Sequence, residues 1–196
     1  MGERASAVRL QVPVGNRPGA GVAISVGGEE ITTMDTEIYS SFSEEDTFQL
    51  GIDFSERLNP GDVVAFYGDL GAGKTEFIKG ICQGMSVEEI VASPTYTIVN
   101  QYVGEDRRRE TVDIFHVDLY RIENSAELLE VGLNDLIANN DSIKLIEWAE
   151  NAEAILPVVR YDIFFVTLDD ENSRRIEIVH RDGAIVENTR SHVYSR

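Results

Sequence analysis

The sequence lacks the features that would tie it to secretion or to a membrane. Its single cysteine, Cys82, cannot form an internal disulfide, which favours a reducing compartment. There is no run of about 18 apolar residues, and the N-terminal apolar patch at residues 20–26 has no A-x-A-like cleavage site. These absences exclude a disulfide-stapled secreted domain, and we expect a cytoplasmic protein without a membrane partner.

Basic residues are also scarce, with 17 Lys and Arg against 35 Asp and Glu in 196 residues, giving a net charge of −18 at pH 7. A surface this negative repels phosphate backbones unless its basic residues gather in one place. The densest basic run, residues 107–109, is flanked by acids in EDRRRE and is typical of a solvated hairpin turn. We therefore do not expect the chain to bind DNA or RNA by itself.

The chain divides into three stretches by composition. Residues 1–41 contain scattered glycines and no sustained helical or strand period, so we expect a flexible N-terminal extension. Residues 42–182 have the regular apolar patterns of one α/β domain, and residues 183–196 are expected to form a C-terminal tail. We find neither an internal repeat nor a second domain.

Apolar spacing within residues 42–182 separates expected helices from expected strands. Helical spacing covers residues 43–58, residues 75–85 and a short stretch capped by Asn124 and Glu127. The run DVVAFY at residues 62–67 is typical of a strand buried on both faces. Further strands, including two hairpins, are expected in five stretches: 93–103 with 111–122, 142–147, and 161–168 with 175–180.

Residues 68–75, GDLGAGKT, match the phosphate-binding pattern G-x-x-x-x-G-K-[ST]. Glycines let the backbone wrap a phosphate with its N–H groups inward, and the following helix presents its positive end. Lys74 is expected to reach the β and γ phosphates, and the Thr75 hydroxyl to ligate Mg²⁺. Because an expected strand precedes the loop and an expected helix follows it, we predict a P-loop NTPase-like, three-layer α/β/α fold. Its central sheet would be mixed and would include antiparallel hairpins.

Hydrolysis of a nucleotide also needs a carboxylate near the metal and a group that positions water. Asp118 and Glu147 each end an apolar strand, where an α/β sheet presents groups to its ligand crevice. A surface or capping carboxylate is the alternative interpretation for each, and the sequence leaves open which of the two lies closer to the metal.

Five other residues have weaker signals. Ser93, Thr95 and Thr97 in SPTYT fit a mobile switch that senses the γ-phosphate, although Ser-Pro before Thr is also a common turn. Trp148 is interpreted as a core residue more readily than as a residue of the nucleotide site. His116 is interpreted as a strand residue whose hydrogen bonds are satisfied and not as a catalytic base, and it lies on the same face as Asp118.

The glycine loop, SPTYTIVNQY, HVDLYR and IEWAE occur in this order. With these motifs the sequence resembles the TsaE (YjeE) family of bacterial ATPases over about residues 43–180. That family is needed for threonylcarbamoyladenosine, the modified base beside the anticodon in tRNAs that read codons beginning with A. The resemblance implies a helper ATPase that uses ATP and Mg²⁺, binds the TsaB–TsaD pair and resets it between catalytic cycles. It would turn over slowly alone and meet tRNA only indirectly.

The resemblance also implies roles for individual residues. Asp118 and Lys74 would act at the hydrolytic centre, and Thr75 with Glu147 would serve Mg²⁺. The remaining nucleotide-binding positions, together with Lys74 and Thr75, would be Thr47, Gly71, Ala72, Gly73, Glu150 and Arg174.

Two other functions share the glycine loop. A small-molecule kinase would need an acceptor pocket and a lid with clamping arginines, for which residues 107–109 are the only candidate. A nucleotide-gated binding module without enzymatic activity would use Asp118 and Glu147 only as structural residues. GTP is disfavoured as the nucleotide, because no N-K-x-D-like guanine signature follows the loop.

Overall fold

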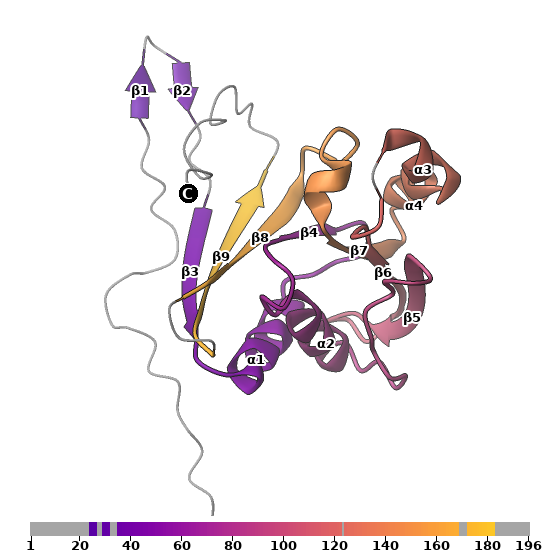
Figure 1. Ribbon diagram of the computed structural model, residues 1–196, viewed down its shortest axis with the longest axis horizontal. Helices are drawn as coiled ribbons and strands as arrows, with labels where there is room; N and C mark the ends of the chain where they lie inside the picture. The colour runs from indigo at the N-terminus through magenta and orange to yellow at the C-terminus, as the bar shows by residue number, and fades with distance from the viewer. Residues whose placement is uncertain (1–23, 27–28, 32–34, 123, 169–171, 183–196) are drawn as a thin grey trace, which may run out of the picture.

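A computed structural model of the protein describes residues 24–26, 29–31, 35–122, 124–168 and 172–182 (Figure 1). Its helices are α1 (Glu44–Ser55), α2 (Lys74–Gly84), α3 (Ser125–Glu130), α4 (Leu133–Ala138) and the 3₁₀ turn η1 (Ala149–Ala152). A seven-stranded sheet contains β3 (Asp35–Ser41), β4 (Val63–Tyr67), β5 (Val99–Glu105), β6 (Thr111–Asp118), β7 (Ser142–Glu147), β8 (Arg160–Thr167) and β9 (Arg174–Arg181). The short strands β1 (Ile24–Val26) and β2 (Glu29–Ile31) pair with each other.

The strand order of the main sheet is β3-β9-β8-β4-β7-β6-β5. The four central strands β8, β4, β7 and β6 run parallel. Outside them, β9 pairs antiparallel with β8, β3 pairs antiparallel with β9, and β5 pairs antiparallel with β6. Glu147 at the end of β7 aligns with Phe66 of β4 on one side and with Asp118 of β6 on the other. The carboxyl ends of β4, β6 and β7 therefore meet at one edge of the sheet, where an open α/β sheet places its ligand crevice.

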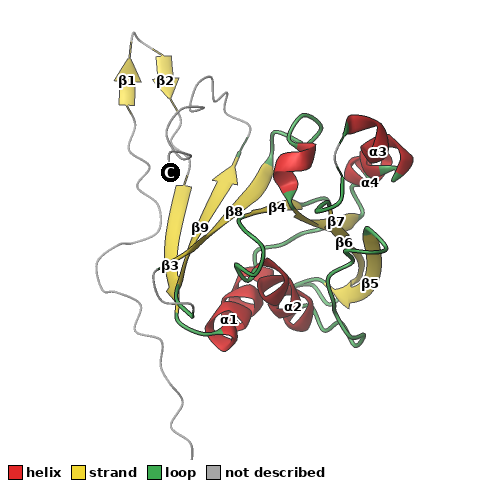
Figure 2. Cartoon of the chain, viewed as in Figure 1, coloured by secondary structure: helices red, strands yellow, loops and turns green. Residues whose placement is uncertain are grey.

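Helices cover both faces of the sheet (Figure 2). In β4, Val64 and Phe66 pack into the core cluster that contains residues of α1 and α2. Val63, Ala65 and Tyr67 point the other way, into the cluster formed with α3, α4 and η1. This alternation explains the continuous apolar run of β4 and confirms the expected three-layer α/β/α arrangement.

Helices α1 and α2 approach each other through two glycines. A Cβ atom on Gly80 would lie 2.1 Å from the carbonyl oxygen of Phe48 and 3.0 Å from the Cα of Gly51. Only glycine fits at this crossing, because any side chain would push the helices apart. The close contact brings the start of α1, with Thr47, beside the loop that leads into α2.

Several expectations from the sequence are confirmed. Ser43 caps α1 by accepting a hydrogen bond from the Asp46 amide at 3.0 Å. Asn124 caps α3 by accepting from the Glu127 amide at 3.2 Å. Both expected hairpins form, as β5–β6 and β8–β9, and the basic run at residues 107–109 lies in the exposed turn between β5 and β6.

Two boundaries differ from the prediction. The sheet starts before residue 42, where we expected the domain to begin, because Asp35–Ser41 forms an edge strand paired with β9. Its apolar residues Ile38 and Tyr39 are adjacent in the chain and so give no alternating signal. Residues 93–98 are not part of the strand expected at 93–103, because Pro94 cannot donate to a ladder and Ile98 has a φ of +65°.

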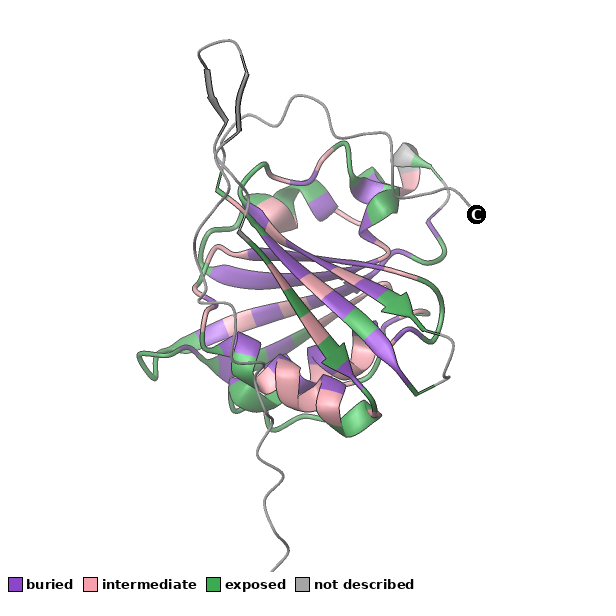
Figure 3. Cartoon of the chain, turned by 90° about the vertical axis from the view of Figure 1, so that its left-hand side faces the viewer, coloured by how far each residue is buried: buried purple, intermediate pink, exposed green. Residues whose placement is uncertain are grey.

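Burial is concentrated in the central strands, while the outer turns of the helices and many loop residues are exposed (Figure 3). Within the residues that the structure describes, no helix has the length and apolar character needed to cross a membrane. Residues 1–23 and the tail expected at 183–196 lie outside the described part of the chain, so those expectations stay predictions.

Candidate nucleotide-binding site

The loop between β4 and α2 depends on three glycines. Gly68, Gly71 and Gly73 have φ angles of +134°, +80° and +106°, in the left-handed region that side chains disfavour. A Cβ atom on Gly68 would also lie 2.6 Å from the carbonyl oxygen of Phe165. Gly71 has no atom within 4 Å of such a Cβ, so glycine is needed there for its backbone conformation alone.

The loop ends at the N-terminus of α2, with Gly73 at the N-cap position. Buried Phe77, Ile78 and Ile81 fix this helix against the sheet. Its unpaired N–H groups and positive dipole end are thereby held beside the glycine loop, an arrangement that favours anions. A cavity of about 330 Å³ opens here and is lined by Leu70, Gly71, Ala72, Gly73, Lys74, Thr75, Glu76, Ser93, Thr95, Asp118, Tyr120, Glu147 and Trp148.

Lys74 folds its side chain back over the loop and is 3% exposed. Its Nζ donates to the carbonyl oxygens of Gly68 at 2.5 Å and Asp69 at 2.9 Å, and lies 4.1 Å from the ring centroid of Trp148. Burial lowers the pKa of Lys74, and this lowering is opposed by four carboxylates: Glu147, Glu150, Asp118 and Asp69. Among the described residues no carboxylate forms an ion pair with Lys74, so its charge is available to an anionic ligand.

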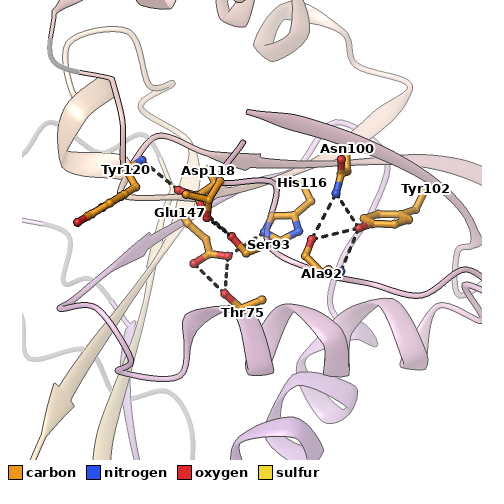
Figure 4. Close-up of polar contacts among 10 residues, drawn as sticks. Thr75, Ala92, Ser93, Asn100, Tyr102, His116, Asp118, Tyr120 and Glu147 are labelled. Carbon is orange, nitrogen blue, oxygen red and sulfur yellow. Dashed lines mark hydrogen bonds and ion pairs between the residues drawn. The ribbon is translucent and has the colours of Figure 1, made fainter. Parts of the chain in front are cut away.

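Thr75 and Glu147 are joined directly. The Thr75 hydroxyl donates to Glu147 Oε1 at 2.8 Å and to Oε2 at 3.1 Å (Figure 4). Glu147 is 3% exposed, and its Oε1 also lies 2.8 Å from Nε2 of the fully buried His116. The first turn of α2 and the end of β7 thus present a hydroxyl and a carboxylate at one point.

Asp118 is held on both oxygens. Its Oδ2 accepts from the hydroxyls of Ser93 at 2.5 Å and Thr95 at 2.7 Å, while its Oδ1 accepts from the Tyr120 amide at 3.0 Å. The two hydroxyls are themselves 2.7 Å apart. The Ser-Pro-Thr segment is therefore bound to the carboxylate that the family resemblance assigns to hydrolysis, whereas Thr97 donates to Asn100 instead.

Two aromatic rings flank the cavity. Trp148, with a strained φ of +57°, and Tyr120 have ring centroids 5.0 Å apart. The interpretation of Trp148 as a core residue is incomplete, because its partly buried ring packs on the second core cluster and also lines the cavity. Sequence reasoning missed Tyr120, although it follows Asp118 by two residues in HVDLYR.

Thr47 and Arg174 lie behind the glycine loop and do not line the cavity. Arg174 Nη1 donates to Thr47 Oγ1 at 3.0 Å and would lie 3.3 Å from a Cβ atom on Gly73. Arg174 is 7% exposed, and its partner among the described residues is the neutral hydroxyl of Thr47. Its buried guanidinium adds positive potential directly behind the loop.

Glu150 lies farther from the nucleotide site than we expect from the sequence. It lies in η1, is exposed, and does not line the cavity. Its charge still acts on the site, because it is among the carboxylates that oppose the lowered pKa of Lys74.

The donor set at Thr75 and Glu147 fits Mg²⁺. Within the described ranges, no group of three or more His, Cys, Asp or Glu side chains could hold a metal ion by itself. Mg²⁺ in nucleotide sites needs only one or two protein oxygens, because phosphates and water complete its coordination. A hydroxyl and a carboxylate beside a phosphate-binding loop meet that requirement. They would hold Mg²⁺ together with the phosphates of a bound nucleotide.

Comparisons with known proteins agree with this geometry. A family model for the threonylcarbamoyl adenosine biosynthesis protein TsaE matches residues 41–176. The tRNA threonylcarbamoyladenosine biosynthesis protein TsaE of Nostoc sp. is 38% identical over 138 residues, which are 69% of this chain and 80% of that protein. The protein of the same name from Haemophilus influenzae is 40% identical over 117 residues, 60% of this chain and 69% of that protein.

A solved structure is also similar. The crystal structure of YdiB from Bacillus subtilis matches with a TM-score of 0.62 at 28% identity, over 76% of this chain and 88% of that one. The residues matched by the family model include the glycine loop, Asp118, Glu147 and Arg174.

Proposed function

The chain belongs to the TsaE family of threonylcarbamoyl adenosine biosynthesis proteins, and we propose that its contribution to that pathway is magnesium-dependent hydrolysis of ATP. Membership gives it a role in the biosynthesis of threonylcarbamoyladenosine in tRNA and a P-loop fold that binds nucleotides. One observation carries the proposal further. The hydroxyl of Thr75 and the carboxylate of Glu147 meet directly below the glycine loop.

Each part of the site has a role in this proposal. The loop amides and the N-terminus of α2 bind the phosphates, and Lys74 neutralises their charge from within the loop. Arg174 supports them from behind Gly73, and Thr47 holds the guanidinium in place. Thr75 and Glu147 hold Mg²⁺, which when bound supplies further charge neutralisation to the phosphates.

Asp118 is proposed to orient the attacking water and accept its proton. It ends β6, next to Glu147, and lines the same cavity. Ser93 and Thr95 occupy its Oδ2, so that oxygen can engage water only after the segment has moved. We call these two hydrogen bonds to Asp118 the latch. The latch gives a physical reason for slow turnover by the chain alone and for stimulation by a partner that displaces the segment.

The partner proposed from the family resemblance is the TsaB–TsaD pair. Two features support a protein partner at this face. Leu70 in the glycine loop is 76% exposed, and Ile90 and Tyr96, which flank Ser93, are 93% and 84% exposed. The net charge of −18 suits a partner with a basic face and leaves tRNA to that partner. We propose that the chain works in the cytoplasm, a location that its single cysteine favours.

The kinase alternative loses its candidate lid. Residues 107–109 lie in the turn between β5 and β6 and are absent from the cavity lining, and Arg109 pairs with Glu105 at 2.9 Å. In the described part of the chain, no arginine lines the cavity.

An ATPase assay tests the proposal. ATP turnover would be measured for the chain alone and with TsaB–TsaD, each with and without tRNA. We expect slow turnover alone and faster turnover with the partners. If turnover stays at background in every combination while ATP changes the affinity for the partners, the chain is instead a nucleotide-gated binding module without enzymatic activity.

A further inference from the structure

We propose that His116 is a positioning residue, which orients the Glu147 carboxylate for the cation and does not itself touch nucleotide or metal. The inference rests on the proposed magnesium site. It starts from one contact, the 2.8 Å distance between His116 Nε2 and Glu147 Oε1, with both side chains buried (Figure 4). His116 lies on β6 opposite Leu145 of β7, two positions before the pair of Asp118 with Glu147. The imidazole therefore reaches Glu147 diagonally across the same sheet face.

The contact fixes the tautomer of the ring. An ionised carboxylate only accepts hydrogen bonds, so His116 Nε2 must carry the proton that it donates to Oε1. His116 Nδ1 has no hydrogen-bond partner, and it is the only such buried side-chain nitrogen or oxygen among the described residues. The tautomer with its proton on Nε2 places no N–H at Nδ1, and so avoids a buried donor without an acceptor.

Stability gives no reason to place a histidine here. The preceding residues on the same face of β6 are Val112 and Ile114, both in the apolar cluster against α2. A buried polar nitrogen without a partner costs free energy of folding, and an apolar side chain of similar size would not carry that cost. The benefit of His116 must therefore lie in its hydrogen bond with Glu147.

The two oxygens of Glu147 are held differently. Oε1 accepts from both Thr75 and His116 at 2.8 Å, whereas Oε2 accepts from Thr75 alone among the described residues, at 3.1 Å. The bond from His116 does not depend on Thr75. His116 would therefore keep Oε1 in place if the Thr75 hydroxyl turned to a bound cation, and Oε2 would be the oxygen with acceptor capacity to spare.

The test compares two substitutions of His116 with a control on the same strand. His116→Leu removes the donor, His116→Gln keeps an N–H donor at the position of Nε2, and Ile114→Val perturbs the same buried face without touching Glu147. The measured quantity is the affinity for a fluorescent ATP analogue with Mg²⁺, divided by the affinity with EDTA. The melting temperature of each variant is recorded alongside.

We expect His116→Leu to lower this affinity ratio about 10- to 100-fold, the range found when support for a metal ligand is lost. His116→Gln should restore most of the ratio. In EDTA the three variants should bind the analogue like the parent chain, and His116→Leu should melt no lower than Ile114→Val.

Three outcomes would overturn the inference. If Mg²⁺ does not raise the affinity of the parent chain, the proposed magnesium site is wrong, and this inference falls with it. If the parent responds to Mg²⁺ and His116→Leu keeps the same ratio, only the inference is wrong. A purely structural role would lower the melting temperature and the EDTA affinity of His116→Leu and His116→Gln together.

Discussion

The hydroxyl of Thr75 donates to both carboxylate oxygens of Glu147, and this contact joins the first turn of α2 to the end of β7. The two residues are 72 positions apart in the chain and come together because β4 and β7 are parallel neighbours. The hydroxyl gives the Glu147 carboxylate a hydrogen-bond donor that does not depend on a metal ion. The site can therefore be assembled before nucleotide and cation arrive.

Glu147→Gln should remove the effect of Mg²⁺ on nucleotide binding. The amide keeps a hydrogen-bond partner for Thr75 but lacks the charge that attracts the cation. We expect at least about a 10-fold loss in affinity for a fluorescent ATP analogue with Mg²⁺, and little change in EDTA. Titrations with and without Mg²⁺ measure this, and an equal loss under both conditions would mean that Glu147 supports the loop instead.

Asp118→Asn should keep nucleotide binding and lose turnover. Asparagine can still accept hydrogen bonds from Ser93 and Thr95, but it cannot take a proton from water. Loss of a general base costs about 100- to 10,000-fold in rate. Single-turnover ATP hydrolysis in the presence of the partners is the measurement. Turnover close to that of the parent chain would assign Asp118 to the latch alone.

Gly80→Ala should destabilise the fold by forcing α1 and α2 apart. The new Cβ would meet the Phe48 carbonyl oxygen at 2.1 Å. Overpacking of this kind costs about 1–3 kcal/mol, or roughly 2–4 °C in melting temperature for each kcal/mol in a domain of this size. Gln83→Ala, on the exposed side of α2, is the control for calorimetry. A melting temperature equal to that of the control would show that the helices can separate freely.

The affinity for ATP should fall as the pH rises, and the fall should begin at a lower pH than it would for a lysine with an ordinary pKa. Burial lowers the pKa of Lys74, and only the charged ammonium attracts phosphate. Below the lowered pKa Lys74 is protonated and binding is full. As the pH rises through it, the charge and its contribution are lost. Titrations from about pH 7 to about pH 10 test this against Lys74→Ala, whose affinity should not show this decline. The same alkaline decline in that variant would rule out Lys74 as its source.

The central strand, the loop and the two carboxylates follow from the sequence because their signals are local. DVVAFY precedes the glycines, α2 has a clear helical period, and Asp118 and Glu147 each end an apolar run. The parallel sheet then brings these strand ends together without further information.

Other features depend on contacts between residues far apart in the chain, and these contacts leave little trace in the local sequence pattern. Thr47 and Arg174 are 127 positions apart, and their contact depends on the close crossing of α1 with α2 and on the register of β9. The edge strand β3 needs β9 to pair with, and its sequence does not alternate. The hydrogen bond from His116 to Glu147 likewise appears only when β6 lies beside β7.

The most direct measurement is a titration of the chain, Lys74→Ala and Lys79→Ala with a fluorescent ATP analogue in the presence of Mg²⁺. Lys79 lies on the same helix, where it pairs with Glu76 and takes no part in the cavity lining. We expect the parent chain and Lys79→Ala to bind alike, and Lys74→Ala to lose about 100-fold or more in affinity, since bonds to charged groups contribute about 1.5–3 kcal/mol each. Equal affinity in all three proteins would contradict the account, because the glycine loop would then not be the nucleotide site.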